Sequence, residues 1–306
     1  MNSIFVDAKL DDGARRKALY EGQLFVHSPT PRSLELCRLA QSLSVDAFGP
    51  FDPRTAQNEV PVGKFAAILE NLKPKFIHHP RAKELIPLLL EELGCDLKKT
   101  YFDVPRLRTS TSNNYLTTGI AYAFHPHRDT WYSAPQCQIN WWIPVYDITP
   151  DNCMAFHLRY WDKALKNGSR DYNYFRWNAQ GRVTAGKQIG TDTRQQPKPE
   201  EPAELDPQVR LVVPPGGIVV FSGAHLHSSV PNTSGYTRFS IDFRTVHIDD
   251  ARNGRGAPNL DSECTGTTMR DYLNCEDLSH VPDEVLARFD AQAPADGVLI
   301  YQPQQA

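Results

Sequence analysis

The chain has 306 residues, of which 40% are hydrophobic and 23% charged, a composition typical of soluble globular proteins. Its 33 basic and 36 acidic side chains give a formal net charge of −3, and no long run of one sign points to nucleic acid or an anionic membrane as a partner. The six cysteines are too few and too widely spaced for a disulfide framework or a structural zinc site, and no apolar signal region or membrane span is present, so we expect a reduced, cytoplasmic protein.

The first hundred residues are predicted to be mostly helical. In the stretch SPTPRSLELCRLAQSLSVDAFG, Thr30 is suited to cap a helix, Pro31 fits its first turn, and apolar residues recur at helical spacing. The stretch HHPRAKELIPLLLEELGCD predicts a second helix that ends at Gly94, because glycine is favoured just after a helix C-terminus. Pro87 should bend or restart this helix, since proline lacks the backbone donor and clashes with the preceding turn.

From about residue 101 the pattern changes to short strands. Runs rich in β-branched and aromatic residues are NYLTTGIAYAFHPH, CQINWWIPVYDI, NCMAFHLRYW, VRLVVPPGGIVVFSGAHLH and YTRFSIDFRTVHI. Strands this numerous, without helices between neighbours, predict an antiparallel sandwich or barrel. We therefore expect one domain over 1–306, with a helical part at 1–100 packed on a core at 101–248. A polar, turn-rich insertion at about 160–207 should cover one end of the core, and 249–306 should form a C-terminal extension.

Two short motifs contain residues that bind transition metals. His127 and Asp129 form an H-x-D motif, and side chains two residues apart on a strand point to the same side, so one imidazole and one carboxylate could reach one ion. Farther along the chain, His225 and His227 follow the apolar run GGIVVFSG. Two histidines and one carboxylate that leave coordination positions open are typical of Fe(II) sites for oxygen chemistry.

An arginine downstream of these histidines is suited to bind a dicarboxylate. Arg238 lies eleven residues after His227 (238 − 227 = 11), in the strand-like run YTRFSIDFR beyond the turn PNTSG. A hairpin would return this strand beside the histidine, and a guanidinium can hold a carboxylate through two parallel hydrogen bonds. Ser229 faces the same side as His227 and could add a hydroxyl bond, while Arg244 is the alternative anchor.

Together these motifs resemble the Fe(II)/2-oxoglutarate dioxygenases of the phytanoyl-CoA dioxygenase type. The resemblance covers roughly 101–248 and consists of H-x-D, a distant H-x-S-x-x-N and the downstream arginine, that is, His127, Asp129, His227, Ser229, Asn232 and Arg238. It implies a mainly β fold with flanking helices and a double-stranded β-helix (jelly-roll) core. It also implies Fe(II) bound by the two histidines and the aspartate, and 2-oxoglutarate bound by the arginine with the serine, with O₂ as the second cosubstrate.

The resemblance further implies an oxidoreductase that hydroxylates a C–H bond of a small-molecule metabolite while 2-oxoglutarate is converted to succinate and CO₂. Asp129 argues against halogenation, because related halogenases have a small residue there and bind chloride in its place. Desaturation, cyclisation and epimerisation use the same kind of site and stay open. Where the family usually has glycine, this chain has Cys153, in a region that often borders the substrate, so the substrate is not identified.

Further residues are predicted to line the site. Those expected to contact the substrate lie near the ligands or on a strand of the barrel: Arg128, Trp131, His225 and Trp142. Of these, Trp131 follows the ligand pair most closely. Trp141 and Trp142 are adjacent on a strand, so only one of them can face the barrel interior. Asn113 or Asn114 could donate a hydrogen bond to the cosubstrate from a neighbouring strand.

Two other interpretations of the same residues stay open at this point. One is a cupin-type metalloenzyme that uses His125, His127 and His225 without 2-oxoglutarate. The other is a non-enzymatic jelly-roll module that binds a ligand with its many aromatic side chains. Conversion of 2-oxoglutarate to succinate by the purified protein with Fe(II) would distinguish the dioxygenase from both.

Overall fold

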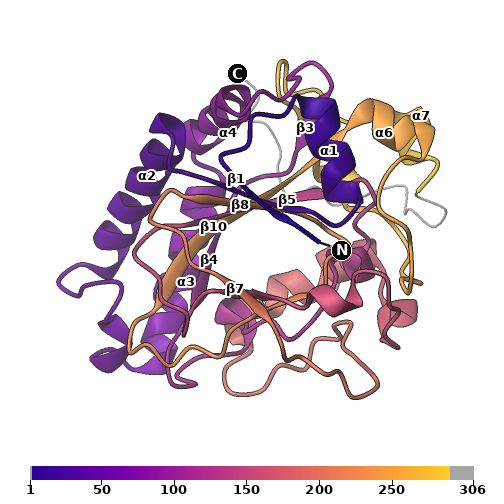
Figure 1. The fold of residues 1–306 in the computed structure, drawn as a ribbon. Coiled ribbons are helices and arrows are strands. Elements are labelled where there is room, and N and C mark those ends of the chain that lie inside the picture. Colours follow the sequence, from indigo (N-terminus) through magenta and orange to yellow (C-terminus); the bar gives the residue numbers. More distant parts are fainter. Residues whose placement is uncertain (1, 290–306) are drawn as a thin grey trace.

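The computed structural model describes residues 2–289, shown as a ribbon in Figure 1; the end of the expected C-terminal extension, 290–306, lies outside the described residues. The helices, in chain order, are α1 (Asp12–Tyr20), α2 (Pro31–Phe48), α3 (Val62–Ile77), α4 (Pro80–Glu92), α5 (Tyr174–Arg176), α6 (Ile248–Asn253) and α7 (Asp283–Leu286). The strands are β1 (Ile4–Val6), β2 (Leu24–His27), β3 (Thr100–Phe102), β4 (Arg106–Ser110), β5 (Ile139–Pro144), β6 (Met154–Phe156), β7 (Val209–Leu211), β8 (Ile218–Ser222), β9 (His227–Ser229), β10 (Arg238–His247) and β11 (Leu273–Asn274).

The helix ends follow the local sequence signals. Thr30 accepts a hydrogen bond from the backbone of Ser33, whose hydroxyl accepts one in return, so the predicted cap of α2 is a complete capping box. Gly94 has φ +72° directly after the last residue that caps α4, as predicted for a glycine at this position. Pro87 does not end α4 but lies inside it, because the packing of buried leucines on either side keeps the helix continuous.

Two strands near the N-terminus were missed. β1 and β2 form a parallel pair, and β2 continues the main sheet by pairing antiparallel with β8. Their runs of three and four residues are too short to show a strand period. The N-terminal part therefore supplies an edge of the sheet as well as the helices.

Two sheets form the jelly-roll core. The larger has eight strands in the order β1-β2-β8-β5-β10-β3-β11, with β4 also paired to β10, and the smaller has the order β7-β6-β9. In Figure 1 the indigo and purple helices α2, α3 and α4 lie along one side of the larger sheet. The prediction of a mainly β fold with flanking helices and a double-stranded β-helix core is confirmed.

The long central strand β10 has two chemically different faces. Phe239, Ile241 and Phe243 are fully buried in the apolar core beneath the helices. The alternating positions, with Arg238 at one end and Arg244 near the other, face the interior between the sheets and line a cavity. Because strand side chains alternate, this one strand supplies both the core and a wall of the cavity.

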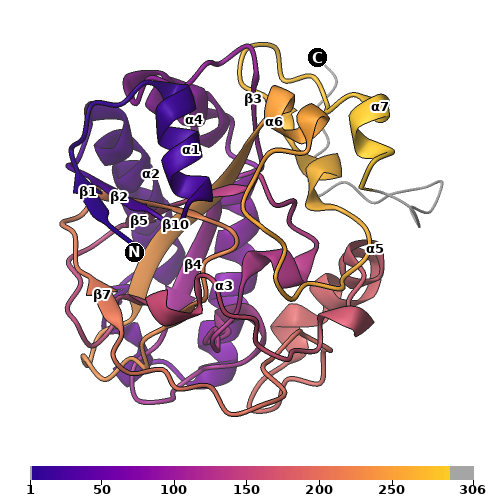
Figure 2. The same cartoon turned by 45° about the vertical axis from the view of Figure 1, so that its right-hand side comes forward.

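The chain between β6 and β7 forms a long irregular connection that covers the cavity. It contains α5, which Figure 2 shows far from α2 on the opposite side of the molecule. At Gly119, φ is +60°, and a Cβ there would come within 2.3 Å of the carbonyl oxygen of Ala185, so glycine allows this connection to pack closely on the loop before the H-x-D motif. Within residues 2–289, the helices are too short or too polar for any of them to cross a membrane.

Candidate metal centre and cavity

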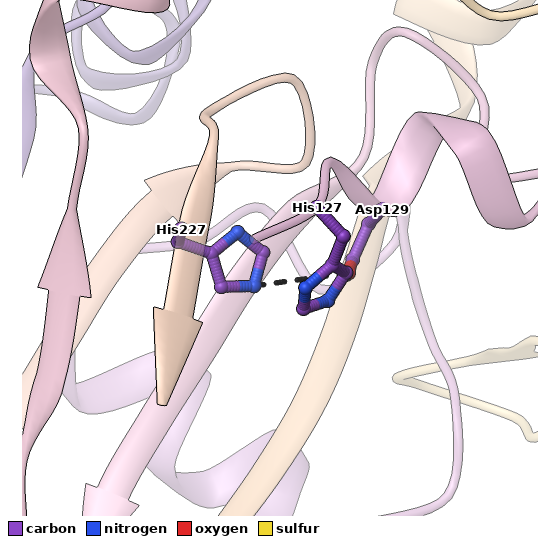
Figure 3. A group of neighbouring side chains, drawn as sticks. All are labelled: His127, Asp129 and His227. Atoms are coloured by element: carbon purple, nitrogen blue, oxygen red, sulfur yellow. Dashed lines mark ion pairs between the residues drawn. The ribbon is translucent and has the colours of Figure 1, made fainter. Parts of the chain in front are cut away.

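An antiparallel backbone pair between His127 and His227 brings three metal-binding side chains together. The backbone N–H of His127 donates to the carbonyl of His227 at 2.9 Å, and the N–H of His227 donates in return at 3.0 Å. Asp129 begins the short 3₁₀ helix that follows. Its Oδ1 lies 3.5 Å from His127 Nε2 and 3.9 Å from His227 Nε2. Figure 3 shows the two rings and the carboxylate pointing toward one another, and their donor atoms all lie within 4.8 Å.

Each histidine is oriented through its other ring nitrogen. His127 Nδ1 donates to the carbonyl of His125 at 2.8 Å, and His227 Nδ1 donates to the carbonyl of His225 at 3.0 Å. A carbonyl can only accept, so both Nδ1 atoms carry a proton. In the neutral ring, Nε2 then has a free lone pair, which can bind a metal ion at the centre of the cluster. Burial lowers the pKa of His227 to about 4, which keeps its ring in the neutral form that binds metals.

The carboxylate is held in the same way. Asp129 Oδ2 accepts hydrogen bonds from Asn140 Nδ2 at 2.8 Å and from Gln138 Nε2 at 3.0 Å, which leaves Oδ1 for a metal. Burial raises the pKa of Asp129, but the two neighbouring imidazoles and the hydrogen bond from Asn140 outweigh burial, so the net pKa lies below its ordinary value. Two neutral imidazoles and an ionised carboxylate fit Fe(II).

Asn140 offers a test of this arrangement. Asn140→Ala should weaken Fe(II) binding about 10-fold to 100-fold, because Asp129 would lose its shorter orienting hydrogen bond. Anaerobic Fe(II) titration measures the affinity, and Asn71→Ala, on the exposed side of α3, is the matched control. Unchanged iron affinity in Asn140→Ala would show that Asp129 does not depend on this bond.

The cupin-type set is not assembled. His125 Nδ1 lies 2.8 Å from the Tyr122 hydroxyl and its Nε2 lies 2.6 Å from the carbonyl of Pro197, so both ring nitrogens are engaged away from the metal centre. The ring of His225 is buried against Trp161, with ring centroids 4.5 Å apart. Among residues 2–289, the one cluster of three metal-binding side chains is the His127, Asp129 and His227 set.

A cavity of about 340 Å³ opens beside the metal centre. Of the predicted site residues, those that line it are His127, Asp129, His227, Ser229, Arg238 and Trp142. Several aromatic side chains line it as well, from the segment before the metal ligands and from the long connection between β6 and β7. Its size suits a small molecule beside a bound cosubstrate.

Arg238 is a buried cation that faces this cavity. Its Nη1 donates to the carbonyls of Asn152 at 2.8 Å and Cys153 at 3.2 Å, and its guanidinium lies 5.5 Å from the centre of the Trp142 ring. Burial lowers its pKa to about 10, so it stays protonated at neutral pH. Among the described residues no carboxylate lies within ion-pair distance, and Nε has no hydrogen-bond partner. Such a cation is suited to an anion from outside the protein.

Asn232, from the H-x-S-x-x-N motif, forms hydrogen bonds with the backbone and does not line the cavity. Its amide donates to the carbonyls of Ser110 and Tyr236, each at 2.8 Å. It thereby fixes the turn that leads into β10 and sets the start of the strand that carries Arg238.

Three of the predicted substrate contacts do not line the cavity. Arg128 is buried on the far side of the metal ligands, where its Nε donates to Asp261 at 3.1 Å. Trp131 is fully buried and donates to the same aspartate at 2.8 Å. The ring of His225 is buried against that of Trp161. For Arg128 the reason is alternation: a residue between two ligands that face the cavity must point away from it.

Asn113 also lies away from the cavity. It is exposed, has φ +54°, and donates its backbone N–H to the carbonyl of Asn232 at 2.9 Å. Asparagine tolerates this left-handed conformation better than most residues, so its role is in the turn. The neighbouring Asn114 is likewise exposed with φ +56°.

A group of charged lining residues was missed. These are Lys73 on α3, Arg106 and Arg108 on β4, and Asp242 on β10; Arg244, which was predicted as the alternative anchor, lines the cavity with them. The sequence does contain a pattern that indicates these residues. RLRTS and RFSIDFR both alternate polar with apolar residues, which is typical of a strand with one polar face.

Comparison with known proteins gives a family match. The model of the phytanoyl-CoA dioxygenase (PhyH) family matches residues 48–240. Among solved structures, the chain is similar to EvdO2 from Micromonospora carbonacea var. aurantiaca, at 14% identity, with 79% of this chain and 93% of that chain covered and a TM-score of 0.44. It is also similar to SnoN, a non-heme alpha ketoglutarate dependent epimerase from nogalamycin biosynthesis, at 13% identity, 83% and 95% coverage and a TM-score of 0.37. A search of curated proteins gives no match.

The matched segment spans more than half of the chain and includes all three residues of the metal centre and Arg238. The cofactor is Fe(II), and the cosubstrates are 2-oxoglutarate and O₂, as predicted. The chain belongs to the phytanoyl-CoA dioxygenase family.

Proposed function

We propose that this protein is an Fe(II)- and 2-oxoglutarate-dependent oxygenase that hydroxylates a C–H bond of a small-molecule metabolite. The observation that carries this proposal is the pairing, in one cavity, of a two-histidine, one-carboxylate cluster with the buried and unpaired guanidinium of Arg238. A metalloenzyme that does not use an anionic cosubstrate has no need of that cation, and a simple binding module has no need of the cluster.

In this proposal each residue has a defined task. His127, Asp129 and His227 hold the iron, which, with 2-oxoglutarate and O₂, supplies the oxidation of the C–H bond as 2-oxoglutarate becomes succinate and CO₂. Arg238 and Ser229 orient the far carboxylate of 2-oxoglutarate. The connection between β6 and β7 lies over the cavity and excludes water from the reacting groups.

The direct test is to incubate the purified protein with Fe(II), 2-oxoglutarate and O₂ and to measure succinate. We expect slow succinate formation even without substrate, and none after a chelator removes the iron. If neither succinate formation nor 2-oxoglutarate binding is found, the proposed function is wrong and the binding-module interpretation is favoured.

The products should contain oxygen or an added double bond, but no chlorine. Asp129 occupies the coordination position that chloride needs, and its second oxygen is fixed by two hydrogen bonds. Mass spectrometry of the products formed in chloride buffer measures this. A chlorinated product from the wild-type protein would contradict it.

We also propose that residues 1–306 act as one domain in the cytoplasm. All six cysteines are free thiols, which supports a reducing compartment. β1 and β2 belong to the same sheet as β10, which supports a single folded unit.

A further inference from the structure

Apart from Arg238, a second group of cations lines the cavity, and the proposed function does not use it. We call Lys73, Arg106, Arg108 and Arg244 the basic wall. Arg106 and Arg108 extend from β4 and Arg244 from β10, on the faces that point between the sheets. Four cations on one wall of a small cavity need either acidic partners or an anionic ligand.

Aspartates on the neighbouring strands compensate part of this charge. Asp103, which is fully buried, accepts hydrogen bonds from both Arg106 and Arg244. Asp242 accepts from Arg108 through both oxygens, at 2.7 and 3.3 Å. Two carboxylates thus serve three guanidinium groups, and the Nε of Arg244 is buried without a hydrogen-bond partner.

The remaining charged groups near the basic wall do not balance its positive charge. Lys73 donates its ammonium proton to a neutral acceptor, the carbonyl of Ile120. Asp271 contributes one more negative charge near Arg106, and it accepts a hydrogen bond from the Tyr174 hydroxyl. Burial lowers the pKa of Lys73 to about 7 and raises the pKa of Asp103 to about 7, so each carries part of its charge at neutral pH. These two partial charges offset each other, and four basic side chains facing three carboxylates leave an excess of one positive charge.

The metal centre does not neutralise that charge. Fe(II) carries +2, Asp129 −1 and 2-oxoglutarate −2, and Arg238 adds +1, so the loaded centre sums to zero. The other basic residue that lines the cavity, Arg194, is paired with Asp192 at 2.6 Å. One uncompensated positive charge is left for a third molecule, the substrate.

The basic wall is separate from the end of the strand that carries Arg238. Arg244 lies six residues further along β10, roughly 20 Å at the rise of a strand. It is the register partner of Asn140, whose side chain holds Asp129. An anion on Arg244 would therefore lie beside the metal centre, where a substrate must be.

Part of the remaining cavity lining is aromatic. It includes aromatic side chains from the segment before and after the H-x-D motif and from the connection between β6 and β7: Tyr122, Phe124, Tyr132, Tyr172 and Trp177. Rings of this kind pack on planar or apolar molecules.

We propose that the substrate is an organic acid whose carboxylate is bound by Arg106 and Arg244 and whose flat, apolar body lies against these aromatic rings. The proposal rests on the proposed function for the oxidation of this acid but not for its binding. It excludes cationic substrates and places the charged end of the substrate on β4 and β10.

The test compares acids with their neutral amides. Isothermal titration of the anaerobic protein, with and without Fe(II) and 2-oxoglutarate, would use 3-phenylpropanoate and 2-naphthoate against 3-phenylpropanamide and 2-naphthamide. We expect each acid to bind about tenfold or more tightly than its amide. Arg244→Gln should remove this preference and leave amide binding unchanged, and Arg244→Lys should keep part of it.

Arg159→Gln is the control, because Arg159 pairs with Glu204 outside the cavity lining. The wild-type comparison needs no variant, so it decides the question even if an arginine variant does not fold. If the acids bind no more tightly than the amides, or do not bind, the proposal is wrong. It is also wrong if Arg244→Gln weakens 2-oxoglutarate binding and leaves the acid preference intact. Acid binding without succinate formation would refute the proposed function alone.

Discussion

His127→Ala and Asp129→Ala should each abolish Fe(II)-dependent conversion of 2-oxoglutarate to succinate. Each substitution removes one of three donor atoms that converge within 4.8 Å, and the remaining two cannot hold Fe(II) with the same affinity or geometry. Succinate formation and anaerobic Fe(II) titration measure the two effects. Both should fall together, because activity is lost through loss of the metal.

His225→Ala is the matched control for these variants. The carbonyl of His225, not its ring, accepts the hydrogen bond from His227 Nδ1, and alanine keeps that carbonyl. The variant should therefore retain iron binding and part of the activity, with some loss of stability because a buried ring is removed. If His225→Ala were inactive and His227→Ala active, the choice of the distal ligand would be wrong.

Arg238→Ala should weaken 2-oxoglutarate binding by roughly thirty-fold to several-thousand-fold, the equivalent of about 2–5 kcal/mol for one partner lost from a desolvated charge pair. The substitution leaves the far carboxylate of 2-oxoglutarate in a buried place without a counter-charge. Arg238→Lys should give an intermediate affinity, since it keeps the charge but loses the two-pronged geometry. Titration of 2-oxoglutarate into the anaerobic Fe(II) protein, followed by its charge-transfer absorption, measures this affinity.

Iron affinity should change little in Arg238→Ala, because Arg238 is not a metal ligand. The structure also assigns Arg238 a local role, since its guanidinium donates to the carbonyls of Asn152 and Cys153, so thermal unfolding should be recorded in parallel. Arg210→Ala is the control, because Arg210 donates to the nearby Pro150 carbonyl from an exposed position. Wild-type affinity for 2-oxoglutarate in Arg238→Ala would place the anchor elsewhere, with Arg244 next to be tested.

The metal cluster was predictable because its geometry is local. The side chains of His127 and Asp129 share a side through their two-residue spacing, and His227 is brought to them by a single backbone pair. The same alternation also predicts that Arg128 points away, and neglecting it led to a wrong placement. The substrate role assigned to Trp131 failed for another reason, since nearness in sequence does not tell which way a short 3₁₀ helix turns its side chains.

Other features could not be predicted from local sequence patterns, because they depend on residues far apart in the chain. The partner of both Arg128 and Trp131 is Asp261, more than a hundred residues away, and no local pattern indicates such a contact. The pairing of β1 and β2 with the main sheet likewise depends on contacts distant in sequence. Long-range contacts, more than local preferences, separate the predicted fold from the observed one.

The two-faced strand β10 limits how this enzyme can diverge. Insertion or deletion of one residue within it would turn Phe239, Ile241 and Phe243 toward the iron and bury Arg238 and Arg244 under the helices, so fold and chemistry would fail together. Within β10, new specificity is therefore expected from substitution at Ser240, Asp242 and Arg244, while Phe239, Ile241 and Phe243 keep the scaffold. Redesign libraries within this strand can be restricted to those cavity-facing positions.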